Sequence, residues 1–270
     1  MSVLPAATEP AASGAGHGGG ATDIAAVLMH HVLDQPFFGL PSKHLVFFVF
    51  AAVLVIVLAR LALASYRAGR VPSGVGAFVE MLVVFIRDDL AEKNIGHGEG
   101  ARWTPLLCSF FFFILVAALL GLMPFSATST GNLAVTMALA GVSFIAQQWA
   151  GISKHGVVHH FTGIVPPGLP GWLLPIMIPV EVISMFTKPF ALMIRLFANM
   201  LAGHMVIATL LLLIPLMAGV STFLGVSMIP VSLGLSLFIM ILEVLVAFIQ
   251  AYIFTLLTSI FIGMYAHPAH

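Results

Sequence analysis

The amino-acid sequence predicts an all-α integral membrane protein with about five membrane-crossing helices and one amphipathic helix in the membrane interface. Of its 270 residues, 60% are hydrophobic and only 7% are charged, whereas soluble domains carry about 25% charged residues. Apolar runs of roughly 20 residues, the length that crosses the hydrocarbon core of a bilayer, recur along the chain. The formal net charge is zero, so no basic footprint for nucleic acid is present. We therefore expect lipid, and not nucleic acid, around this chain.

The chain divides into two predicted parts. Residues 1–28 are rich in alanine and glycine, and their first 22 positions hold no Lys or Arg. A secretory signal needs a positive start followed by a continuous apolar stretch, so a disordered tail is predicted at 1–28. Residues 29–270 form the predicted polytopic membrane domain.

Three crossings and one surface helix are predicted in the first part of the membrane domain. His44–Ala64 is the first apolar run, and Thr104–Pro124 and Leu133–Gly151 are the next two. Between the first and second runs, apolar residues share one helical stripe, with most charged residues off it, as in a helix lying in the membrane interface. The stripe consists of Phe78, Met81, Leu82, Phe85, Ile86 and Leu90. A loop is expected at Gly151–Trp172.

Two much longer apolar runs follow, Leu173 to about Gly219 and Ser221 to about Tyr265, each about twice the length of one perpendicular crossing. Each run could form two helices, or one long helix that is tilted or bent at a proline. We favour two long tilted helices packed as a hairpin over 173–265, with the turn near Gly219–Pro230. In that arrangement the ionisable residues of both helices can avoid the lipid.

The basic residues between the runs predict the orientation. If the spans alternate, one side of the membrane receives Arg60, Arg67, Arg70, Lys93, Arg102 and Lys154. By the positive-inside rule, the N-terminus is then outside and the C-terminus is cytoplasmic. A bacterial inner membrane is the expected location, with an organelle membrane as the alternative.

Ionisable residues occur inside the two long runs: Glu181, Lys188, Arg195, His204 and Glu243. A charge at mid-bilayer costs about 2.5–3.5 kcal/mol on insertion scales, so each is expected to face protein or water and to have a function. The first three are spaced seven apart and share one helical face, with Asn199 one turn beyond.

An antiparallel hairpin brings residues to the same depth when their numbers have a nearly constant sum. One register then pairs His204 with Glu243 and Arg195 with Gln250. Histidine and glutamate can exchange protons near neutral pH, whereas arginine keeps its charge. The sequence therefore predicts a polar seam suited to proton movement, although it does not separate H⁺ from Na⁺.

Two motifs in this hairpin carry a family resemblance. The first is RLFANMLAG within KPFALMIRLFANMLAGH, from Lys188 to His204, and the second is QAYIFTLL within EVLVAFIQAYIFTLLTSIFIGMY, from Glu243 to Tyr265. They resemble the R-L-F-x-N-M-x-A-G and Q-A-x-I-F-x-x-L signatures of subunit a of F-type ATP synthases. The resemblance is strong over residues 175–265 and consistent in layout from about Met29.

The resemblance implies a proton-translocating stator subunit with two offset aqueous half-channels. Arg195 matches the essential arginine that faces the rotor carboxylates and separates the half-channels. The matching positions along the proton path are His204 and Glu243 for the outer half-channel, Glu181 for the inner one, and Gln250 and Asn199 beside the arginine. The implied partners are a c-subunit rotor ring, b-type peripheral stalk subunits and the rest of the complex.

Two departures from the family pattern are informative. Many bacterial members have Glu and His in the opposite order from His204 and Glu243, so the exchange supports contact between the two. Leu119–Phe125 lacks the aspartate that some members carry there, so Gln147 and Gln148 are candidates to supply polar lining instead.

No cofactor, metal site or enzymatic activity of the chain by itself is expected. The sequence has no phosphate-binding G-x-x-x-x-G-K-[ST] loop and no G-x-S-x-G motif. The cluster His155, His159 and His160 has no neighbouring carboxylate or cysteine in its Gly/Pro-rich segment, which argues against a metal site. The chain is expected to act as a non-nucleotide-binding subunit.

Several alternatives remain open at this level. Arg195 could be a structural partner of Glu181 or Glu243, Glu181 could pair with Lys188, and His204 could form only a buried hydrogen bond with Glu243. Asn199 and Gln250 could simply satisfy polar neighbours. For the whole chain, the alternatives are a secondary ion-coupled transporter, which predicts an inverted repeat, and a structural membrane subunit, which leaves the intramembrane charges unexplained.

Overall fold

The computed structural model describes residues 43–67, 74–122, 133–157 and 174–267. The predicted tail at 1–28, and His159 and His160, lie outside these residues. Within them, every regular element is a helix. Four helices are long and apolar enough to cross a membrane, and a shorter apolar helical stretch occupies Val46–Leu61. The predicted all-α membrane fold is confirmed.

The first crossing and the surface helix appear in the predicted order. Helix α2 spans Lys43–Arg67, and three consecutive segments form the next helical stretch: α3 (Val75–Phe85), η1 (Ile86–Glu92, a π-helix) and α4 (Lys93–Ile95). The predicted apolar stripe is only partly buried. Leu82, Ile86 and Leu90 lie in the core, at 5% exposure or less, whereas Phe78 and Met81 are more than half exposed.

The geometry of the helix accounts for the exposure of Met81. This residue lies about 100° around the helix from Leu82, so the packed row excludes it. Phe78 lies one turn before Leu82 on the same side of the helix, and it is exposed because the packed row begins at Leu82. From there the buried row continues through Ala91 to Ile95.

Helices α5 (Gly100–Gly121) and α6 (Leu133–His155) form the centre of the bundle with the last helix, α9 (Thr222–Ala266). Aromatic pairs join α5 to α9: the ring centroids of Phe110 and Phe254 are 5.3 Å apart, and those of Phe111 and Phe248 are 5.6 Å apart. Helix α2 packs on the other side of α5, where Phe48 meets Phe113 edge-on at 5.0 Å.

Helix α6 is longer than expected. The predicted start of the loop at Gly151 is wrong. The helix continues through Gly151, Lys154 and His155 and ends before Gly156, whose φ is 78°. A glycine in the left-handed region is a common helix terminator. Gly151 itself is buried in the helix, and glycine is more frequent in membrane helices than in soluble ones.

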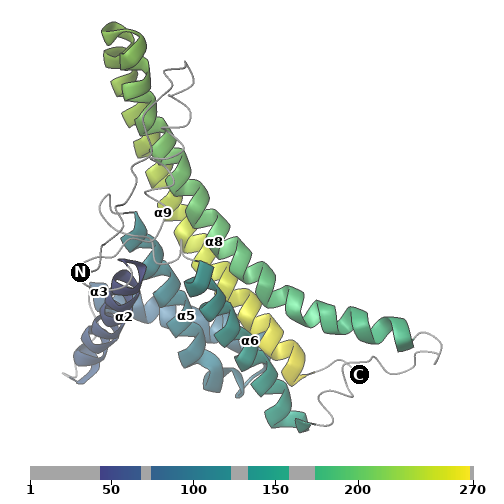
Figure 1. Ribbon diagram of the computed structural model, residues 1–270. Helices are drawn as coiled ribbons and strands as arrows, with labels where there is room; N and C mark the ends of the chain where they lie inside the picture. Colours follow the sequence, from purple (N-terminus) through teal and green to yellow (C-terminus); the bar gives the residue numbers. More distant parts are fainter. Residues whose placement is uncertain (1–42, 68–73, 123–132, 158–173, 268–270) are drawn as a thin grey trace, which may run out of the picture.

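Helices α8 (Leu174–Val220) and α9 form the predicted long hairpin (Figure 1). Each is one helix of 47 or 45 residues rather than two shorter ones. The reversal occupies only Ser221, so the predicted turn at Gly219–Pro230 is too wide, and Pro230 lies inside α9. In Figure 1 the two helices run side by side over much of their length, and the N-terminal part of α8 diverges from α9.

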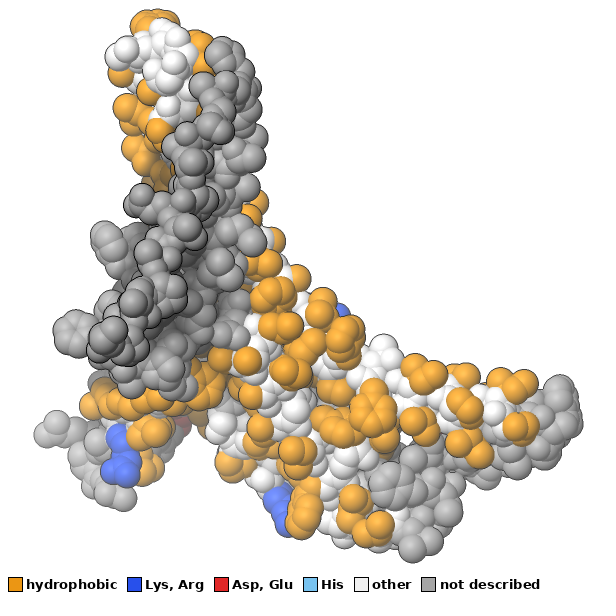
Figure 2. Space-filling view, viewed as in Figure 1, with side chains coloured by type: hydrophobic (Ala, Val, Ile, Leu, Met, Phe, Trp, Pro, Cys, Tyr) orange, Lys and Arg blue, Asp and Glu red, His pale blue; other side chains and the backbone are white. Residues whose placement is uncertain are grey.

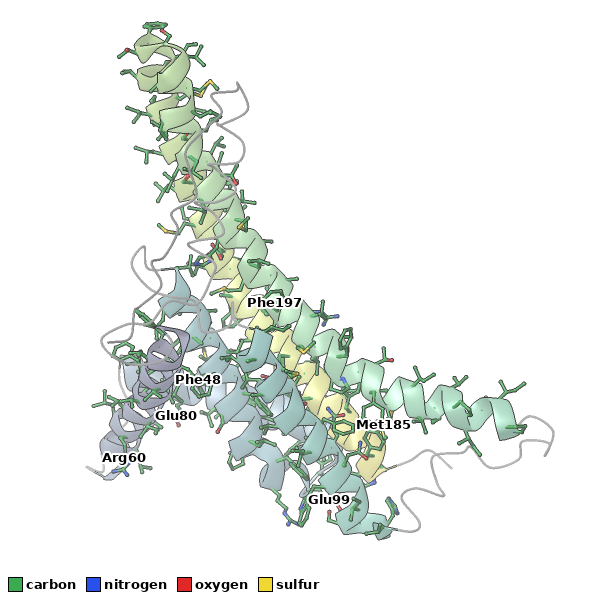
Figure 3. All side chains as sticks on the ribbon, viewed as in Figure 1. Phe48, Arg60, Glu80, Glu99, Met185 and Phe197 are labelled. Carbon is green, nitrogen blue, oxygen red and sulfur yellow. The ribbon has the colours of Figure 1, made fainter. Side chains whose placement is uncertain are left out.

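The described surface suits a lipid environment. On the face shown in Figure 2, most exposed side chains are hydrophobic and few belong to Lys or Arg. Figure 3 shows Arg60 of α2 and Glu99, just before α5, toward the same end of the bundle. The basic residues predicted to share one side are thus compatible with the helix order.

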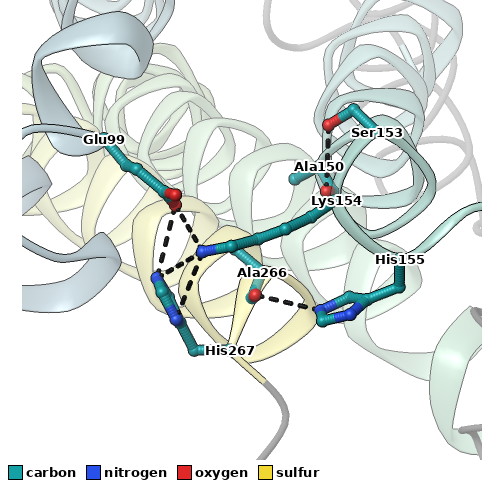
Figure 4. A network of polar contacts seen from close by, with 7 residues as sticks. All are labelled: Glu99, Ala150, Ser153, Lys154, His155, Ala266 and His267. Atoms are coloured by element: carbon teal, nitrogen blue, oxygen red, sulfur yellow. Dashed lines mark hydrogen bonds and ion pairs between the residues drawn. The ribbon is translucent and has the colours of Figure 1, made fainter.

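A polar cluster joins three helix ends at that side (Figure 4). Lys154 Nζ donates to Glu99 Oε2 at 2.8 Å, and it lies 3.0 Å from Nε2 of His267, which follows α9. His267 Nε2 is also 3.3 Å from Glu99 Oε2. The hydrogen bond from Lys154 holds the pKa of Glu99 below its usual value.

Candidate functional site

His204 on α8 and Glu243 on α9 lie against each other in the hairpin. His204 Nδ1 is 3.5 Å from Glu243 Oε1, within ion-pair range but longer than a typical hydrogen bond. The predicted register that brings these two residues to the same depth is confirmed. Contact between an imidazole and a carboxylate provides two groups that can exchange a proton.

The imidazole of His204 also contacts two backbone carbonyl groups. Its Nε2 is 3.0 Å from the carbonyl oxygen of Gly121, at the end of α5, and its Nδ1 is 3.2 Å from that of Met200. A neutral imidazole can donate from only one nitrogen. Because oxygen acceptors face both nitrogens, the geometry suits an imidazolium beside the Glu243 carboxylate.

Glu243 is a buried carboxylate with few polar contacts. Its residue exposure is 6%, and neither carboxylate oxygen has a hydrogen-bond partner among the described residues. Burying such a group without donors is costly. Glu243 therefore depends on the nearby His204, on water or on its own protonation.

Gly203 makes the room that Glu243 occupies. A Cβ at this position would overlap Glu243 Oε1 and lie 2.6 Å from its Cδ. Sequence reasoning missed the role of this residue, although it is the final residue of the RLFANMLAG motif and directly precedes His204. The missed role of Gly121 is a backbone contact, which no side-chain pattern predicts.

Arg195 lies on α8 as an exposed residue, and it makes no hydrogen bond or ion pair with any described residue. It lines a cavity of about 520 Å³ between α8 and α9. The other lining residues are Val180, Ile183, Ser184, Thr187, Lys188, Ala191, Leu192, Leu257 and Phe261. In the described part of the chain, Arg195 forms no closed ion pair with Glu181 or Glu243, which is the structural alternative for this residue.

Arg195 and Gln250, the second predicted pair, both lie in the described part of the chain, and no hydrogen bond joins them. Gln250 is buried, at 6% exposure, whereas Arg195 is exposed. Across the cavity from Arg195 the α9 residues are Leu257 and Phe261. Helix α8 still packs on α9 at this level through the buried side chains of Leu192 and Leu196. Arg195 lies beside that packed face and is exposed, so the register that pairs His204 with Glu243 does not give a contact between Arg195 and Gln250.

The remaining predicted residues occupy α8 around Arg195. Asn199 and Glu181 are both partly buried. At 1.5 Å per residue, Arg195 is about 14 Å along α8 from His204 and about 21 Å from Glu181. The His204 and Glu181 positions are thus about 35 Å apart along α8, with Arg195 between them.

Lys188 is held by α9. Its Nζ lies 5.5 Å from the ring centroid of Phe261 and 5.4 Å from that of Tyr265, and it contacts Met264 Sδ at 3.4 Å. No ion pair joins Lys188 to Glu181, both of which the structure describes. The alternative of a Glu181–Lys188 structural pair is therefore not observed.

Gln147 does not supply lining beside His204. Its Nε2 donates to Ser143 Oγ at 3.0 Å, and Ser143 in turn contacts Thr258 Oγ1 at 3.0 Å. Thr258 lies about 22 Å along α9 from Glu243. The expectation for Gln147 is wrong, since its side chain is used in packing α6 against α9.

Among the described residues, no group of three or more His, Cys, Asp or Glu side chains is placed to hold a metal ion. His155 ends α6, and its Nε2 lies 3.2 Å from the carbonyl oxygen of Ala266. Its backbone contact on α9 gives this histidine a structural role.

Comparison with known proteins agrees with the geometry. The profile of the family described as ATP synthase A chain matches residues 45–263. The chain belongs to this family. It is 52% identical over 204 residues to ATP synthase subunit a of Myxococcus xanthus (strain DK1622), which covers 74% of this chain and 64% of that protein.

Other bacterial members of the ATP synthase A chain family are similarly close. Subunit a of Anaeromyxobacter dehalogenans (strain 2CP-C) is 42% identical, covering 92% of this chain and 72% of that protein. Subunit a of Chloroherpeton thalassium (strain ATCC 35110 / GB-78) is 51% identical, covering 74% of this chain and 58% of that protein. This chain therefore spans about three fifths to three quarters of the length of these relatives.

Family membership resolves several expectations. The relatives are named as a subunit of ATP synthase, so the expectation of a subunit rather than an enzyme by itself is confirmed. With its apolar helices, the chain is a multi-pass membrane protein of a family found in bacteria. The alternative of a secondary transporter receives no support from the family match.

Proposed function

We propose that this chain is the proton-translocating stator subunit of a rotary F-type ATP synthase. In this function, two offset aqueous half-channels lead to Arg195 from opposite sides of the membrane. Protons enter from the outside past His204 and Glu243, load a carboxylate of a c-subunit rotor ring, and leave after rotation near Glu181. Gln250 and Asn199 belong to the same path.

The observation that carries the proposal is the state of Arg195. It is a permanent cation within an apolar helix, exposed beside a cavity, with no ion pair to any described residue. Such a charge is costly in lipid, so it requires an anionic partner other than the described residues. A rotor carboxylate is an anion of the required kind.

The arrangement along α8 supports two separate routes. The buried acid–imidazole pair lies on one side of Arg195, and the cavity with Glu181 beyond it extends to the other side. A fixed positive charge between them repels protons, so it blocks direct flow from one route to the other. It also attracts a passing carboxylate and favours its ionised form.

The wider assignments follow from this proposal. The hairpin at 173–265 faces the rotor ring, and b-type peripheral stalk subunits, lipid and the rest of the complex contact the domain at 29–270. The N-terminus lies outside and the C-terminus in the cytoplasm, in a bacterial inner membrane. Arg60 of α2 and Lys154 of α6, whose ammonium contacts Glu99, lie toward the same end of the bundle (Figure 3), which supports this orientation.

The test is ATP-driven acidification of inverted membrane vesicles. Arg195→Ala is expected to abolish acidification while the subunit still assembles, because the rotor carboxylate loses its counter-charge. Ile194→Ala, at the adjacent position that is 40% exposed, is the matched control and should acidify normally. Normal acidification by Arg195→Ala would reject the proposal.

A further inference from the structure

Lys188 and Glu181 pose a problem for the proposed inner route. They are two of three ionisable residues that share a face of α8 at seven-residue spacing, about 10.5 Å apart along the helix axis. Long side chains can bridge this separation directly or through one water. A carboxylate in such a pair is a poor proton acceptor, because the ammonium competes with the proton.

The structure shows the ammonium placed elsewhere. Lys188 Nζ lies over the Phe261 and Tyr265 rings, at 5.5 and 5.4 Å from their centroids, and touches Met264 Sδ at 3.4 Å. Ring faces attract a cation within about 6 Å. Three neighbouring side chains of α9 therefore bind the charge and leave no ion pair with Glu181 among the described contacts.

Tyr265 is itself fixed between elements. Its side chain forms a hydrogen bond with Gln148 of α6, and it interacts electrostatically with Glu181. The ring is thus anchored to α6 on one side, with the carboxylate of Glu181 and the ammonium of Lys188 in its vicinity. The ring, which a phenylalanine would also present, is the part of Tyr265 that lies against the Lys188 ammonium.

We propose that Phe261 and Tyr265 are positioning residues that hold the Lys188 ammonium on α9 and so keep Glu181 free to accept and release protons. The inference rests on the proposed function, since it concerns the inner route. It assigns Lys188 no part in proton transfer. The two rings act on Glu181 through Lys188, and not by packing α8 against α9.

The experiment uses the whole ATP synthase in inverted vesicles and compares four variants. Phe261→Leu with Tyr265→Leu removes both rings, and Lys188→Met removes the ammonium. The third variant combines these three changes, and Tyr265→Phe keeps the ring but loses the hydroxyl. Assembly of each complex is checked by the amount of this subunit that co-purifies with the rotor ring.

Removing both rings is expected to slow acidification by roughly a factor of 3 to 30, the range set by losing an interaction of cation–π strength. Lys188→Met alone should stay within about twofold of the unmodified enzyme, and the combined variant should return to the Lys188→Met rate. A packing role of the rings predicts no such rescue. Tyr265→Phe should retain most of the rate.

Three outcomes would overturn the inference: a combined variant as slow as the ring-less one, a Lys188→Met enzyme as slow as the ring-less one, or a Tyr265→Phe enzyme as slow as the ring-less one. If the ring-less complex does not assemble, Tyr265→Leu alone and Tyr265→Leu combined with Lys188→Met give the same comparison. Failure of the proposed function is separate, because it appears as normal acidification by Arg195→Ala.

Discussion

The carboxylate of Glu243 occupies the space that a Cβ at Gly203 would fill. This close approach lets α9 present a buried acid directly to α8, next to His204. The acid–imidazole contact at 3.5 Å therefore depends on a residue without a side chain as much as on the two ionisable residues.

Gly203→Ala is expected to reduce ATP-driven acidification by roughly tenfold, because the methyl group would push the Glu243 carboxylate, the flexible end of its side chain, away from His204. Gly234→Ala on α9 is the matched control, since a Cβ there meets nothing within 4 Å. The control should be neutral or slightly stabilising, because alanine is the better helix former. Equal rates for the two variants would show that the close approach is unimportant.

Exchanging the pair, His204→Glu with Glu243→His, is expected to retain more acidification than either single change. The exchange keeps one acid and one imidazole in contact, whereas each single change leaves two like groups. Rates are measured in inverted vesicles with the amount of assembled subunit as the control. A double variant no better than the worse single variant would contradict direct cooperation between the side chains.

Gly263→Ala is expected to destabilise the bundle by about 1–3 kcal/mol. A Cβ at this position of α9 would overlap the backbone carbonyl oxygen of Asn94 on α4, and a backbone atom cannot move aside as a side chain can. Thermal unfolding in mild detergent measures the effect. Gly141→Ala on α6, where a Cβ meets nothing within 4 Å, is the control and should unfold like the unmodified protein.

The Glu99–Lys154 contact should stabilise the protein in a pH-dependent way. The pKa of Glu99 is lowered in the folded protein, so its contribution is present above the unfolded-state pKa, about 4.3, and is lost as the pH falls through the lower folded-state value. Because both side chains are partly exposed, the contribution is at most about 1 kcal/mol. Unfolding of Glu99→Gln and unmodified protein should differ at pH 7 and converge as the pH falls through the lowered pKa of Glu99; a constant difference would contradict this account.

Much of the fold follows from the sequence because membrane insertion depends on local properties. Run length and apolar content predict α2, α5 and α6 and the two long runs of α8 and α9. Run length leaves two short helices or one long helix open for each of these runs, and the need to keep their ionisable residues out of lipid favours the long helices. The sequence also predicts the His204–Glu243 contact, since two antiparallel helices joined by a short turn keep a nearly fixed register close to that turn.

The tertiary structure decides which faces of two helices meet and where backbone atoms make the contact. Arg195 and Gln250 share the same predicted register as His204 and Glu243, yet no hydrogen bond joins them, because Arg195 is exposed beside the face of α8 that packs on α9, whereas Gln250 is buried. Three contacts depend on distances between helices: His204 with the Gly121 carbonyl, Glu243 with the space at Gly203, and Lys188 with the rings of α9. Sequence periodicity places a residue on one face of its own helix, but only the packing of several helices determines which atoms that face meets.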